Sequence, residues 1–471
     1  MRRFGMLVEL DVFLVKLMKM NVGKSGHDSI FRIMVYLFLI TIVFGCEKGS
    51  GDKVYYDQVI EIKGDNQYPD INNGSFISLA YEFDQTKKKI SNKVFDRDIH
   101  YLPLETSNEA LVASIDQLII SDDRVMILDK KTKSIFVFDL NGKFKLKINS
   151  IGNGPMEYRV PKRIEWNQYL NTIEVLDNAR GLIQRYDILT GNHVGTLKVG
   201  FGIHSFKLFK KGHYAFLIDS YLFNEDRYAQ VKSLNKQFLI AREKEEGGLE
   251  YISEHLPYQK NSGVLNHTLS QALRSGVNSD LLSNVVFNDT IYSFSEKGIS
   301  PKYVFDFTKW TVPFSFASRD LDDTRRLFDE GALPIINWFW ETKDYVFANV
   351  FLNKQVSYGF FSLISDEKIF IQSSDYLQAG RAFFNPPVAA NDTSLIYTME
   401  PSEVYEIMSI IDRRIDGLYP NANAKRKREV IDSFYVKKEG YEYLDLLDQG
   451  LKEDDNPVLV FAKPNFTNHE N

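Results

Sequence analysis

Two segments of the sequence, 48 residues apart, carry nearly the same pattern. Val125 to Asp139 reads V-M-I-L-D-K-K-T-K-S-I-F-V-F-D, and Ile173 to Asp187 reads I-E-V-L-D-N-A-R-G-L-I-Q-R-Y-D. Each copy has the pattern of a strand, a polar turn and a second strand, followed by a glycine turn at Gly142 or Gly191. Repeats of this length built from paired strands are typical of propeller blades or a comparable array. The repeat therefore predicts a scaffold, and it does not by itself predict a reaction.

The composition allows a large folded structure. The chain has 471 residues, of which 44% are hydrophobic and 14% aromatic, which is typical of a protein with a sizeable core. A chain of this length usually forms two or three domains, but a propeller grows blade by blade without one thick core. A single ring of blades is therefore compatible with the length.

Strand patterns surround the first copy of the repeat. The predicted strands are Asp98–Leu104, Ser114–Ile120, Val125–Leu128, Ser134–Asp139 and Phe144–Ile148, with a weaker candidate at Phe76–Phe83. Between the last two strands, Asn141-Gly142 predicts a type I′ hairpin turn, which needs positive φ at both residues.

The second unit spans Arg163–Val199, and four less regular units follow. The third unit has predicted strands at Tyr214–Ile218 and Tyr228–Val231, and after it we expect a polar insertion at Glu243–Gly263 and a short helix at Leu269–Gly276. The fourth unit covers Val285–Phe307, and the sixth begins near Val388. The fifth has predicted strands at Ile336–Glu341, Tyr345–Val350, Ser357–Leu363 and Lys368–Gln372.

A helical insert interrupts the strands before the end of the chain. Pro401, Ser402 and Glu403 predict a helix N-terminus, and apolar residues at helical spacing follow it. These apolar residues are Val404, Ile407, Met408, Ile411 and Ile415. A second helix is predicted at Ala424–Tyr435, and Pro457–Ala462 is a clear final strand. The basic run Lys425–Arg428 is interpreted as a solvated helix face, or as contact with anionic lipid or a partner helix.

Chain length favours six blades. Residues 94–463 without the insert 402–455 leave 316 residues, or 53 for each of six blades. Known blade repeats have roughly 40 to 50 residues, to which six blades would add some loop, whereas seven blades would have about 45 residues each. The count alone thus separates six blades from seven only modestly. The predicted fold class is all-β: a six-bladed β-propeller of four-stranded antiparallel blades with a helical insert before the last strand.

The N-terminus has the layout of a secretory signal peptide. Ile33–Gly45 is an apolar run of 13 residues, preceded by Lys24 and Arg32, whereas a membrane-spanning helix needs roughly 20. The run ends on Cys46, the only cysteine, and Val43–Cys46 resembles the lipobox of bacterial lipoproteins. We therefore expect a signal peptide at 1–45, lipidation of Cys46, a tether and lead-in segment at 46–93, and a C-terminal tail at 464–471.

Charge and cysteine content limit the partners. Removal of residues 1–45 leaves 51 Lys and Arg against 60 Asp and Glu, a net charge of −9, which argues against a nucleic-acid partner. A single cysteine excludes internal disulfides. No cofactor is predicted. We expect a bacterial cell-envelope protein, anchored by lipid to the outer membrane on its periplasmic or surface face, that binds a glycan, a peptide or a partner protein.

Several segments together resemble a known family. They are Y-L-P-L-E-T-S at Tyr101–Ser107, I-D-Q-L-I-I from Ile115, G-N-G-P-M-E-Y at Gly152–Tyr158, N-D-T-I-Y at Asn288–Tyr292, and D-N-P before V-L-V-F at Asp455–Phe461. The set resembles the six-bladed β-propeller lipoproteins of Bacteroidota, relatives of NHL-type propellers, with Asp98–Lys147 as the first blade. The resemblance implies an envelope propeller and no catalytic residues, because that family mostly lacks an assigned activity.

Two segments are candidate sites. The loop with Gly152, Gly154, Pro155, Glu157 and Tyr158 lacks the lysine and helix of a phosphate loop, so we interpret it as a structural connection between blades in which Glu157 accepts backbone N–H groups. An aromatic group, Trp338, Trp340 and Tyr345, offers faces for stacking a sugar ring, although alternation along the strand is also typical of packing between blades.

Catalytic signatures are absent from the sequence. The eight histidines show no metal-ligand spacing, no serine lies in a nucleophile elbow, and the runs of carboxylates are typical of solvated turns. Neither a metal site nor a catalytic residue is predicted. We favour a binding or scaffolding module, with a lyase-type or hydrolase-type propeller enzyme acting on a glycan or peptide at the central channel as the alternative. Signalling or assembly through the helical insert is a third hypothesis.

Overall fold

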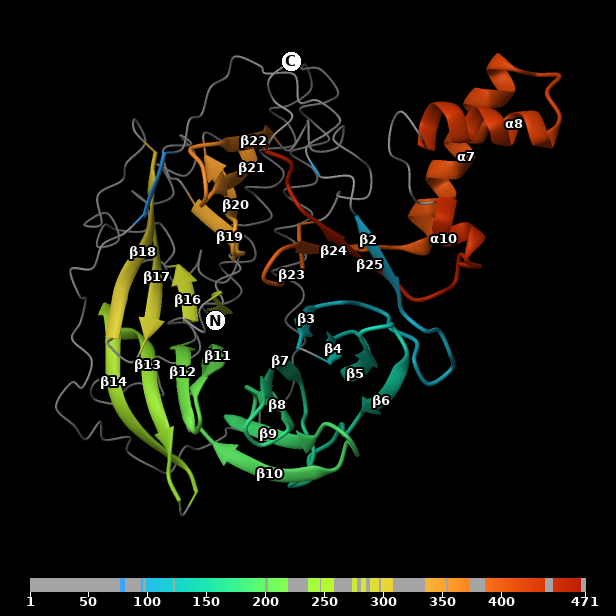
Figure 1. Cartoon of the computed structure of the whole chain (residues 1–471). Helices are drawn as coiled ribbons and strands as arrows, with labels where there is room; N and C mark the ends of the chain where they lie inside the picture. The colour runs from blue at the N-terminus through green and yellow to red at the C-terminus, as the bar shows by residue number, and fades with distance from the viewer. Residues whose placement is uncertain are drawn as a thin grey trace, which may run out of the picture. The chain divides into compact units, whose positions relative to one another are not determined.

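A computed structural model of the chain describes residues 77–80, 95, 99–121, 123–199, 202–218, 236–245, 247–257, 273–277, 281–284, 289–295, 298–307, 335–352, 355–372, 386–436 and 444–466. All of these residues belong to one compact unit, Tyr56–Asn471. Their strands form six sheets (Figure 1), which are the six blades of a propeller. The predicted all-β fold is therefore confirmed.

The first three blades each contain four antiparallel strands that follow one another in the chain. Blade 1 holds β3 (Gln117–Ile120), β4 (Arg124–Asp129), β5 (Ser134–Asp139) and β6 (Phe144–Ile148). Blade 2 holds β7 (Pro161–Asn167), β8 (Thr172–Asp177), β9 (Leu182–Asp187) and β10 (His193–Lys198). Blade 3 holds β11 (Ile203–Lys210), β12 (His213–Ile218), β13 (Lys236–Glu243) and β14 (Leu249–Pro257).

The other three blades are built in the same way, except that two of their strands, β1 and β2, come from the N-terminal part of the chain. Blade 4 holds β15 (Arg274–Ser275), β16 (Leu281–Asn284), β17 (Thr290–Ser295) and β18 (Gly298–Asp306), with β1 (Ile77–Ala80) as a fifth, parallel strand beside β18. Blade 5 holds β19 (Ile335–Glu341), β20 (Tyr345–Leu352), β21 (Gln355–Ser362) and β22 (Lys368–Gln372). Blade 6 holds β23 (Ala389–Ala390), β24 (Leu395–Met399), β25 (Val458–Ala462) and β2 (His100–Pro103).

Packing between blades explains the apolar character of the repeated strands. Side chains on a strand alternate between the two faces of its sheet, and a blade buries both faces against its neighbours. Val125 and Ile127 of β4 accordingly pack with blade 6, and Met126 and Leu128 pack with blade 2. The described core residues form six such clusters, each shared by two successive blades, including blades 6 and 1. The ring is thus closed.

The ring is closed by a blade assembled from both ends of the described chain. β2 pairs antiparallel with β25, for example Leu102 with Leu459. The expectation that Asp98–Lys147 forms the first blade is therefore wrong for its first strand, which belongs to blade 6. The chain then passes over blade 1, where Glu105 N–H donates to Gly142 O at 2.8 Å. A Cβ on Gly142 would collide with Pro103 O, so this crossing requires glycine.

The hairpin turn at Asn141-Gly142 differs from the type predicted. Gly142 has φ +77°, but Asn141 is not among the described residues with positive φ. Asp139 N–H donates to Lys143 O at 2.8 Å, and Gly142 N–H donates to Asp139 O at 3.0 Å. This is the pattern of a longer loop that ends in a left-handed glycine. The position of the turn was predicted correctly and its type was not.

Two expectations for the third and fourth units are corrected by the strands. Leu249–Pro257, expected in a polar insertion, is β14, where Ser253 and His255 are fully buried and lie within hydrogen-bond distance of each other at 2.9 Å. Arg274–Ser275, expected in a short helix, is strand β15. The predicted strand Tyr228–Val231 lies outside the described residues.

The helical insert lies between β24 and β25, as predicted. It consists of α7 (Pro401–Leu418), α8 (Ala424–Val430), a π-helical turn η6 (Ile431–Val436) and α10 (Leu444–Asp448). Glu400 is the N-cap of α7, and its backbone N–H donates to Glu403 Oε2 at 2.8 Å. The buried side chains of α7 include Val404, Ile407, Ile411 and Ile415, which belong to the predicted apolar face.

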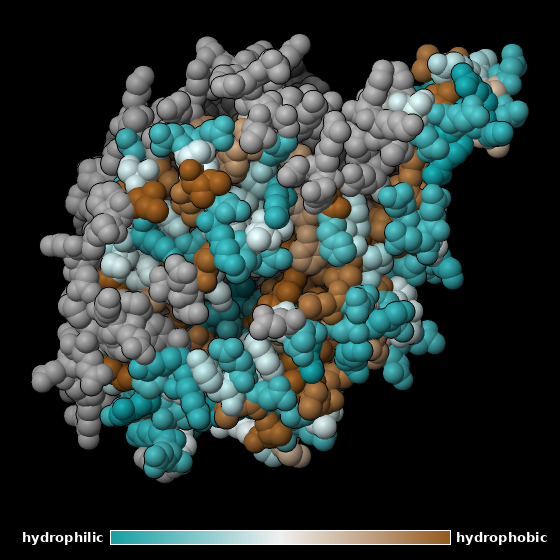
Figure 2. All heavy atoms as spheres, in the orientation of Figure 1, coloured by the Kyte–Doolittle hydropathy of each residue, from teal (hydrophilic) through white to brown (hydrophobic). Residues whose placement is uncertain are grey.

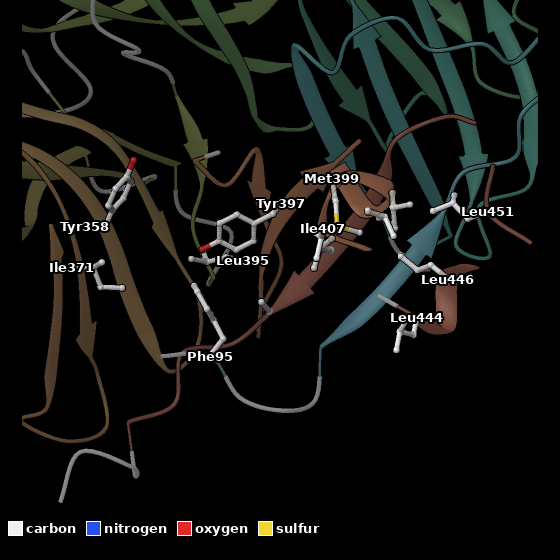
Figure 3. Packing of buried hydrophobic residues seen from close by; sticks show 14 of the residues in the cluster. Phe95, Tyr358, Ile371, Leu395, Tyr397, Met399, Ile407, Leu444, Leu446 and Leu451 are labelled. Carbon is white, nitrogen blue, oxygen red and sulfur yellow. The ribbon is translucent and has the colours of Figure 1, made fainter. Parts of the chain in front are cut away.

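That apolar face packs on the side of the ring formed by blades 5 and 6. Figure 3 shows Ile407 of α7 beside Met399 of β24, with Leu444, Leu446 and Leu451 from the end of the insert on the same cluster. The basic run on α8 is paired within the insert: Arg428 contacts Asp432 at 3.2 Å and Asp448 at 2.9 Å. The insert therefore packs against blades 5 and 6 through its apolar residues.

Candidate functional site

The innermost strands of the blades surround the axis of the ring. β3 contacts β7, β7 contacts β11, β19 contacts β23, and β23 contacts β3. Hydrogen bonds join the remaining neighbours: Leu273 N–H donates to Ser205 Oγ at 3.3 Å, and Val277 N–H donates to Glu341 Oε2 at 2.9 Å. Figure 2 shows hydrophilic side chains in the recessed middle of the face in view. A ligand at this axis would meet side chains from several blades at once.

Blades 1 and 2 bring three charged residues together near the axis. Gln117 Nε2 donates to Ile164 O at 2.7 Å, and Ile164 N–H donates to Gln117 Oε1 at 2.9 Å. Asp116 and Arg163, the chain neighbours of these two residues, therefore lie close to the same contact between the blades. Lys130, at the end of β4, donates its backbone N–H to Asp116 Oδ2 at 2.8 Å. Together with Arg274 and Trp340, which are described next, these three residues form a group that we call the axial cluster.

Blades 4 and 5 supply the other two members. The guanidinium carbon of Arg274 lies 3.9 Å from the centroid of the Trp340 ring, which is a close cation–π contact. Trp340 Nε1 donates to Pro387 O at 3.2 Å and thereby fixes the indole. Arg163, Arg274 and Trp340 are all partly exposed. The cluster thus presents two guanidinium groups and one indole to the same region.

Positive charge in the axial cluster is poorly compensated. Burial, together with the smaller effect of the neighbouring Arg163 charge, lowers the pKa of Arg274 to about 9. Burial also lowers the pKa of Arg163, against the attraction of Asp116. The pKa of Lys130 is lowered by burial first and by Arg163 second. In the described part of the chain, the guanidinium groups of Arg163 and Arg274 form no ion pair with a carboxylate. Lys130 and Arg163 therefore share Asp116 as their nearby carboxylate, and the charged group that acts on Arg274 is Arg163.

The three aromatic residues predicted for stacking occupy two environments. Trp338 and Trp340 of β19 are partly exposed, whereas Phe339 between them is 1% exposed. Trp340 also packs against the clusters on both sides of blade 6. Tyr345 of β20 is 2% exposed, and its ring centroid lies 6.4 Å from that of Phe360 in the core. The stacking hypothesis therefore continues with Trp338 and Trp340 only.

A buried charged network lies between blades 2 and 3. Glu174 Oε1 accepts hydrogen bonds from Arg185 Nε at 2.8 Å, Tyr214 O–H at 2.8 Å and Asn167 Nδ2 at 2.9 Å. Arg185 also donates to both carboxylate oxygens of Glu243, at 2.6 and 2.8 Å. These contacts tie strands of the two blades together. We call this set the interblade network.

A separate ion pair joins the innermost strands of the same blades. Glu165 of β7 is 5% exposed, and Lys207 Nζ of β11 lies 2.9 Å from its Oε1. Its Oε2 atom has no hydrogen-bond partner among the described residues. Burial raises the pKa of Glu165 to about 7, although Lys207 opposes the shift. The carboxyl group therefore loses its proton near neutral pH in the folded protein.

The raised pKa of Glu165 predicts a pH-dependent stability. Unfolded glutamate ionises near pH 4.5 and the folded group near pH 7, so the folded state binds more protons between these values. The free energy of unfolding should therefore fall as the pH rises through this window, by up to about 1.4 kcal/mol per pH unit. Glu165→Gln should remove that part of the slope in urea unfolding from pH 5 to 8. Glu429→Gln, at an exposed helix position, is the control, and equal slopes for Glu165→Gln and wild type would contradict the assignment.

The glycine loop connects blades 1 and 2. Gly154 N–H donates to Glu157 Oε2 at 2.7 Å, and a Cβ on Gly152 would collide with the Glu157 carboxylate. Arg180 Nη1 donates to Gly154 O at 3.0 Å, and Gln184 Nε2 donates to Pro155 O at 3.2 Å. Tyr158 O–H lies 2.9 Å from Lys133 O and 3.1 Å from Ile148 O. These hydrogen bonds hold the loop against strands of blades 1 and 2, and its structural role stays a prediction.

The remaining predictions concern lipidation, metal binding and membrane-spanning helices. Cys46 lies outside the described residues. Within the described residues, no group of three or more His, Cys, Asp or Glu side chains is arranged to hold a metal ion. The helices in this part of the chain are too short or too polar to cross a membrane.

The cations of the axial cluster were not predicted from the sequence. Lys130, Arg163 and Arg274 are separated by 33 and 111 residues, and no local motif joins them. The available signal was that Arg163 and Arg274 both lie in the first strand of a blade. This signal can be used only when the blade boundaries are known. Because Arg274 was assigned to a predicted helix, its position in the first strand of a blade was missed.

Several solved structures are similar to the chain. A protein of Bacteroides fragilis NCTC 9343 described as exported is 15% identical, with 83% of this chain and 100% of that chain covered and a TM-score of 0.58, which shows a shared fold. A DUF4221 family member from Bacteroides vulgatus ATCC 8482 is 11% identical, with 66% and 93% covered and a TM-score of 0.43. Virginiamycin B lyase from Staphylococcus aureus is 14% identical, with 58% and 73% covered and a TM-score of 0.32.

Family membership comes from the sequence itself. No curated protein matches the chain significantly. The model of a domain of unknown function, DUF4934, matches residues 75–463, which includes the whole described propeller. The expected resemblance to a Bacteroidota propeller family without an assigned function is confirmed, and the chain belongs to the DUF4934 family.

Proposed function

We propose that the protein is a lipid-anchored binding module of the bacterial cell envelope, which holds a ligand at the axis of its propeller. The axial cluster carries this proposal: Arg163, Arg274 and Trp340 come from three blades, are partly exposed and converge on one region. Most ligand sites combine such a convergent set of polar groups with an aromatic surface. The ligand class is a glycan, a peptide or a segment of a partner protein.

An envelope location is supported from two directions. The apolar run Ile33–Gly45 ends directly on Cys46, the only cysteine, and a polar, glycine-containing tether follows it. The Bacteroides fragilis protein with the same fold is described as exported. Lipidation of Cys46 would retain the folded propeller at a membrane without a spanning helix, since a lipid chain supplies the apolar anchor.

If a lipid on Cys46 anchors the protein, replacement of Cys46 should change the cell fraction in which the protein is found. Cys46→Ser should move the protein from the membrane fraction to the soluble envelope fraction, because the side chain can no longer accept a lipid. Fractionation followed by immunoblotting measures this, with Ser50→Ala in the tether as the control. Retention of the Cys46→Ser variant in the membrane fraction would contradict the lipobox interpretation.

Binding itself is tested with the full chain solubilised from expressing cells. A glycan array covers saccharides, and a pull-down from the envelope fraction of the native host covers peptides and proteins. The proposal expects at least one ligand whose binding is weakened by Trp338→Ala or Arg163→Gln. A captured ligand that binds both variants as tightly as the wild type would place the site away from the axis.

The propeller enzyme is the second candidate, and the shifted pKa values near the axis favour it. An enzyme needs ionisable groups in perturbed environments, and Lys130, Arg163, Arg274 and Glu165 meet that condition. A guanidinium group is a poor proton donor or acceptor at neutral pH, however, and Glu165 is buried against Lys207. These facts favour binding. Appearance of new reducing ends after incubation with the bound saccharide would favour the enzyme instead.

A further inference from the structure

We propose that the axial cluster binds the carboxylate of an acidic saccharide, with Arg163 and Arg274 as the carboxylate-binding groups and the tryptophans of β19 beside the sugar ring. The inference rests on the proposed function, because it names the ligand class of the same site. It adds a chemical requirement that the proposed function lacks, namely a negative charge on the ligand.

Charge compensation is the first argument. The Arg163 guanidinium and the Lys130 ammonium lie near one carboxylate, Asp116, and the Arg274 guanidinium lies within electrostatic reach of Arg163. Burial lowers the pKa of all three cations, and the like charge of Arg163 adds to the lowering for Lys130 and Arg274. A bound anion would reduce this repulsion and would gain the attraction of both guanidinium groups. Without a ligand, the positive charge of the site is thus only partly balanced, and a bound anion would balance more of it.

The geometry of the donors favours a carboxylate. A guanidinium group presents its N–H donors in a planar fork that matches the two oxygens of a carboxylate. In the described part of the chain, the fork of Arg163 forms no hydrogen bond or ion pair. The fork of Arg274 is held by stacking on Trp340 at 3.9 Å, and no hydrogen bond of the described residues uses its N–H groups. Among the described residues, both forks therefore keep N–H donors that a carboxylate could use.

The aromatic residues favour a saccharide as the carrier of that carboxylate. Trp338 and Trp340 are two residues apart on the innermost strand of blade 5, and both are partly exposed. Indole faces contact the apolar C–H faces of sugar rings, and Trp340 also contacts Arg274 directly. A uronic acid carries a carboxylate on such a ring, so one residue of the glycan can meet both features.

The overall charge of the protein argues for a specific site. Without residues 1–45 the chain has a net charge of −9, so it repels polyanions in general. A cationic cluster at the axis of an acidic protein therefore selects an anion that reaches the axis and fits there. A nucleic acid, which needs an extended basic surface, does not meet this condition.

Calorimetric titration of the full chain with three trisaccharide probes tests the inference. The probes are a uronic-acid trisaccharide, its methyl ester, which keeps the rings and removes the charge, and a neutral trisaccharide that carries one sulfate. We expect the acid form to bind and the ester to bind more weakly by on the order of tenfold or more. Arg163→Gln should cause a similar loss for the acid form, and Arg426→Gln, on the exposed insert, should cause none.

Two further variants separate binding from folding. Arg163→Gln should not lower the melting temperature, because the side chain forms no hydrogen bond among the described residues and its charge is repelled by Arg274. Arg274→Lys keeps the charge and removes the planar fork, so it should bind the acid form less tightly than wild type and more tightly than Arg274→Gln. Equal affinity of the lysine variant and wild type would overturn bidentate binding by this residue.

The outcomes distinguish this inference from the proposed function. Equal binding of the acid and its ester, unchanged in Arg163→Gln, would overturn the carboxylate assignment and leave axial binding of a neutral ligand intact. Binding of the sulfated probe alone would also overturn it. If none of the three probes binds to folded wild type, the acidic-saccharide inference fails, and the pull-down decides the proposed function separately.

Discussion

Replacement of Arg185 by methionine should lower the free energy of unfolding by about 3–5 kcal/mol. Arg185 is the cation of the interblade network, and its Nε atom lies 2.8 Å from Glu174 Oε1. Glu174 is fully buried, and Tyr214 and Asn167 also donate to it. Without Arg185, the carboxylate would keep only neutral donors and would have to stay charged in the core or take up a proton. Urea unfolding of the two proteins measures the difference.

Arg242→Met is the matched control, because Arg242 lies on β13 and pairs with Glu250 of the neighbouring strand β14. Both side chains of this pair are largely exposed, at 54% and 37%, so its loss should cost at most about 1 kcal/mol. The double variant Arg185→Met with Glu174→Gln should recover part of the stability, since it removes the unpaired charge. Equal losses for Arg185→Met and Arg242→Met would show that burial does not govern the network.

The predicted strands were correct where the information is local. Val125–Leu128 and Ile135–Phe138 are continuous apolar runs joined by a polar turn, and a hairpin follows from such a pair without knowledge of the rest of the chain. The same holds for the four strands of blade 5 and for the apolar face of α7. In each of these segments, side-chain periodicity and turn residues indicate the same structure.

The errors concern contacts between distant segments. The pairing of Leu102 with Leu459 spans more than 300 residues, and the sequence around Leu102 is equally compatible with a strand of blade 1. Leu249–Pro257 contains polar residues that are buried in β14, where Ser253 and His255 contact each other. A polar pattern alone predicts exposure, so this strand was missed.

The candidate site was less predictable than the fold, for the same reason. Trp338 and Trp340 could be named because they are close in sequence and large. Tyr345 was grouped with them by proximity, but its position on β20 places it in the core, at 2% exposure. Arg163 comes within electrostatic reach of Arg274 only because blades 2 and 4 face one axis. A site assembled from different blades becomes visible only once the ring is closed.

Closure of the ring itself can be tested at Asn456, which precedes β25. Asn456 is 1% exposed, and its side chain binds the segment that leads from β2 into blade 1. Its Oδ1 atom accepts from Val112 N–H at 2.8 Å, and its Nδ2 group donates to Glu105 O at 2.8 Å and also to Ala110 O. Asn456→Ala should lower the free energy of unfolding by about 2–4 kcal/mol, because buried backbone groups lose their partners.

Asn391→Ala in the same blade is the control for Asn456→Ala. The Asn391 side chain also accepts from two backbone N–H groups, those of Thr393 and Ser394, at 3.0 and 2.8 Å. These bonds stay within one local turn, so their loss should cost about 1 kcal/mol. Asn456→Asp is the sharper test: it keeps the acceptor for Val112 but directs a carboxylate at two carbonyl oxygens, so it should destabilise at least as much as alanine. If the aspartate variant unfolds at the same urea concentration as wild type, the closing contact does not stabilise the ring.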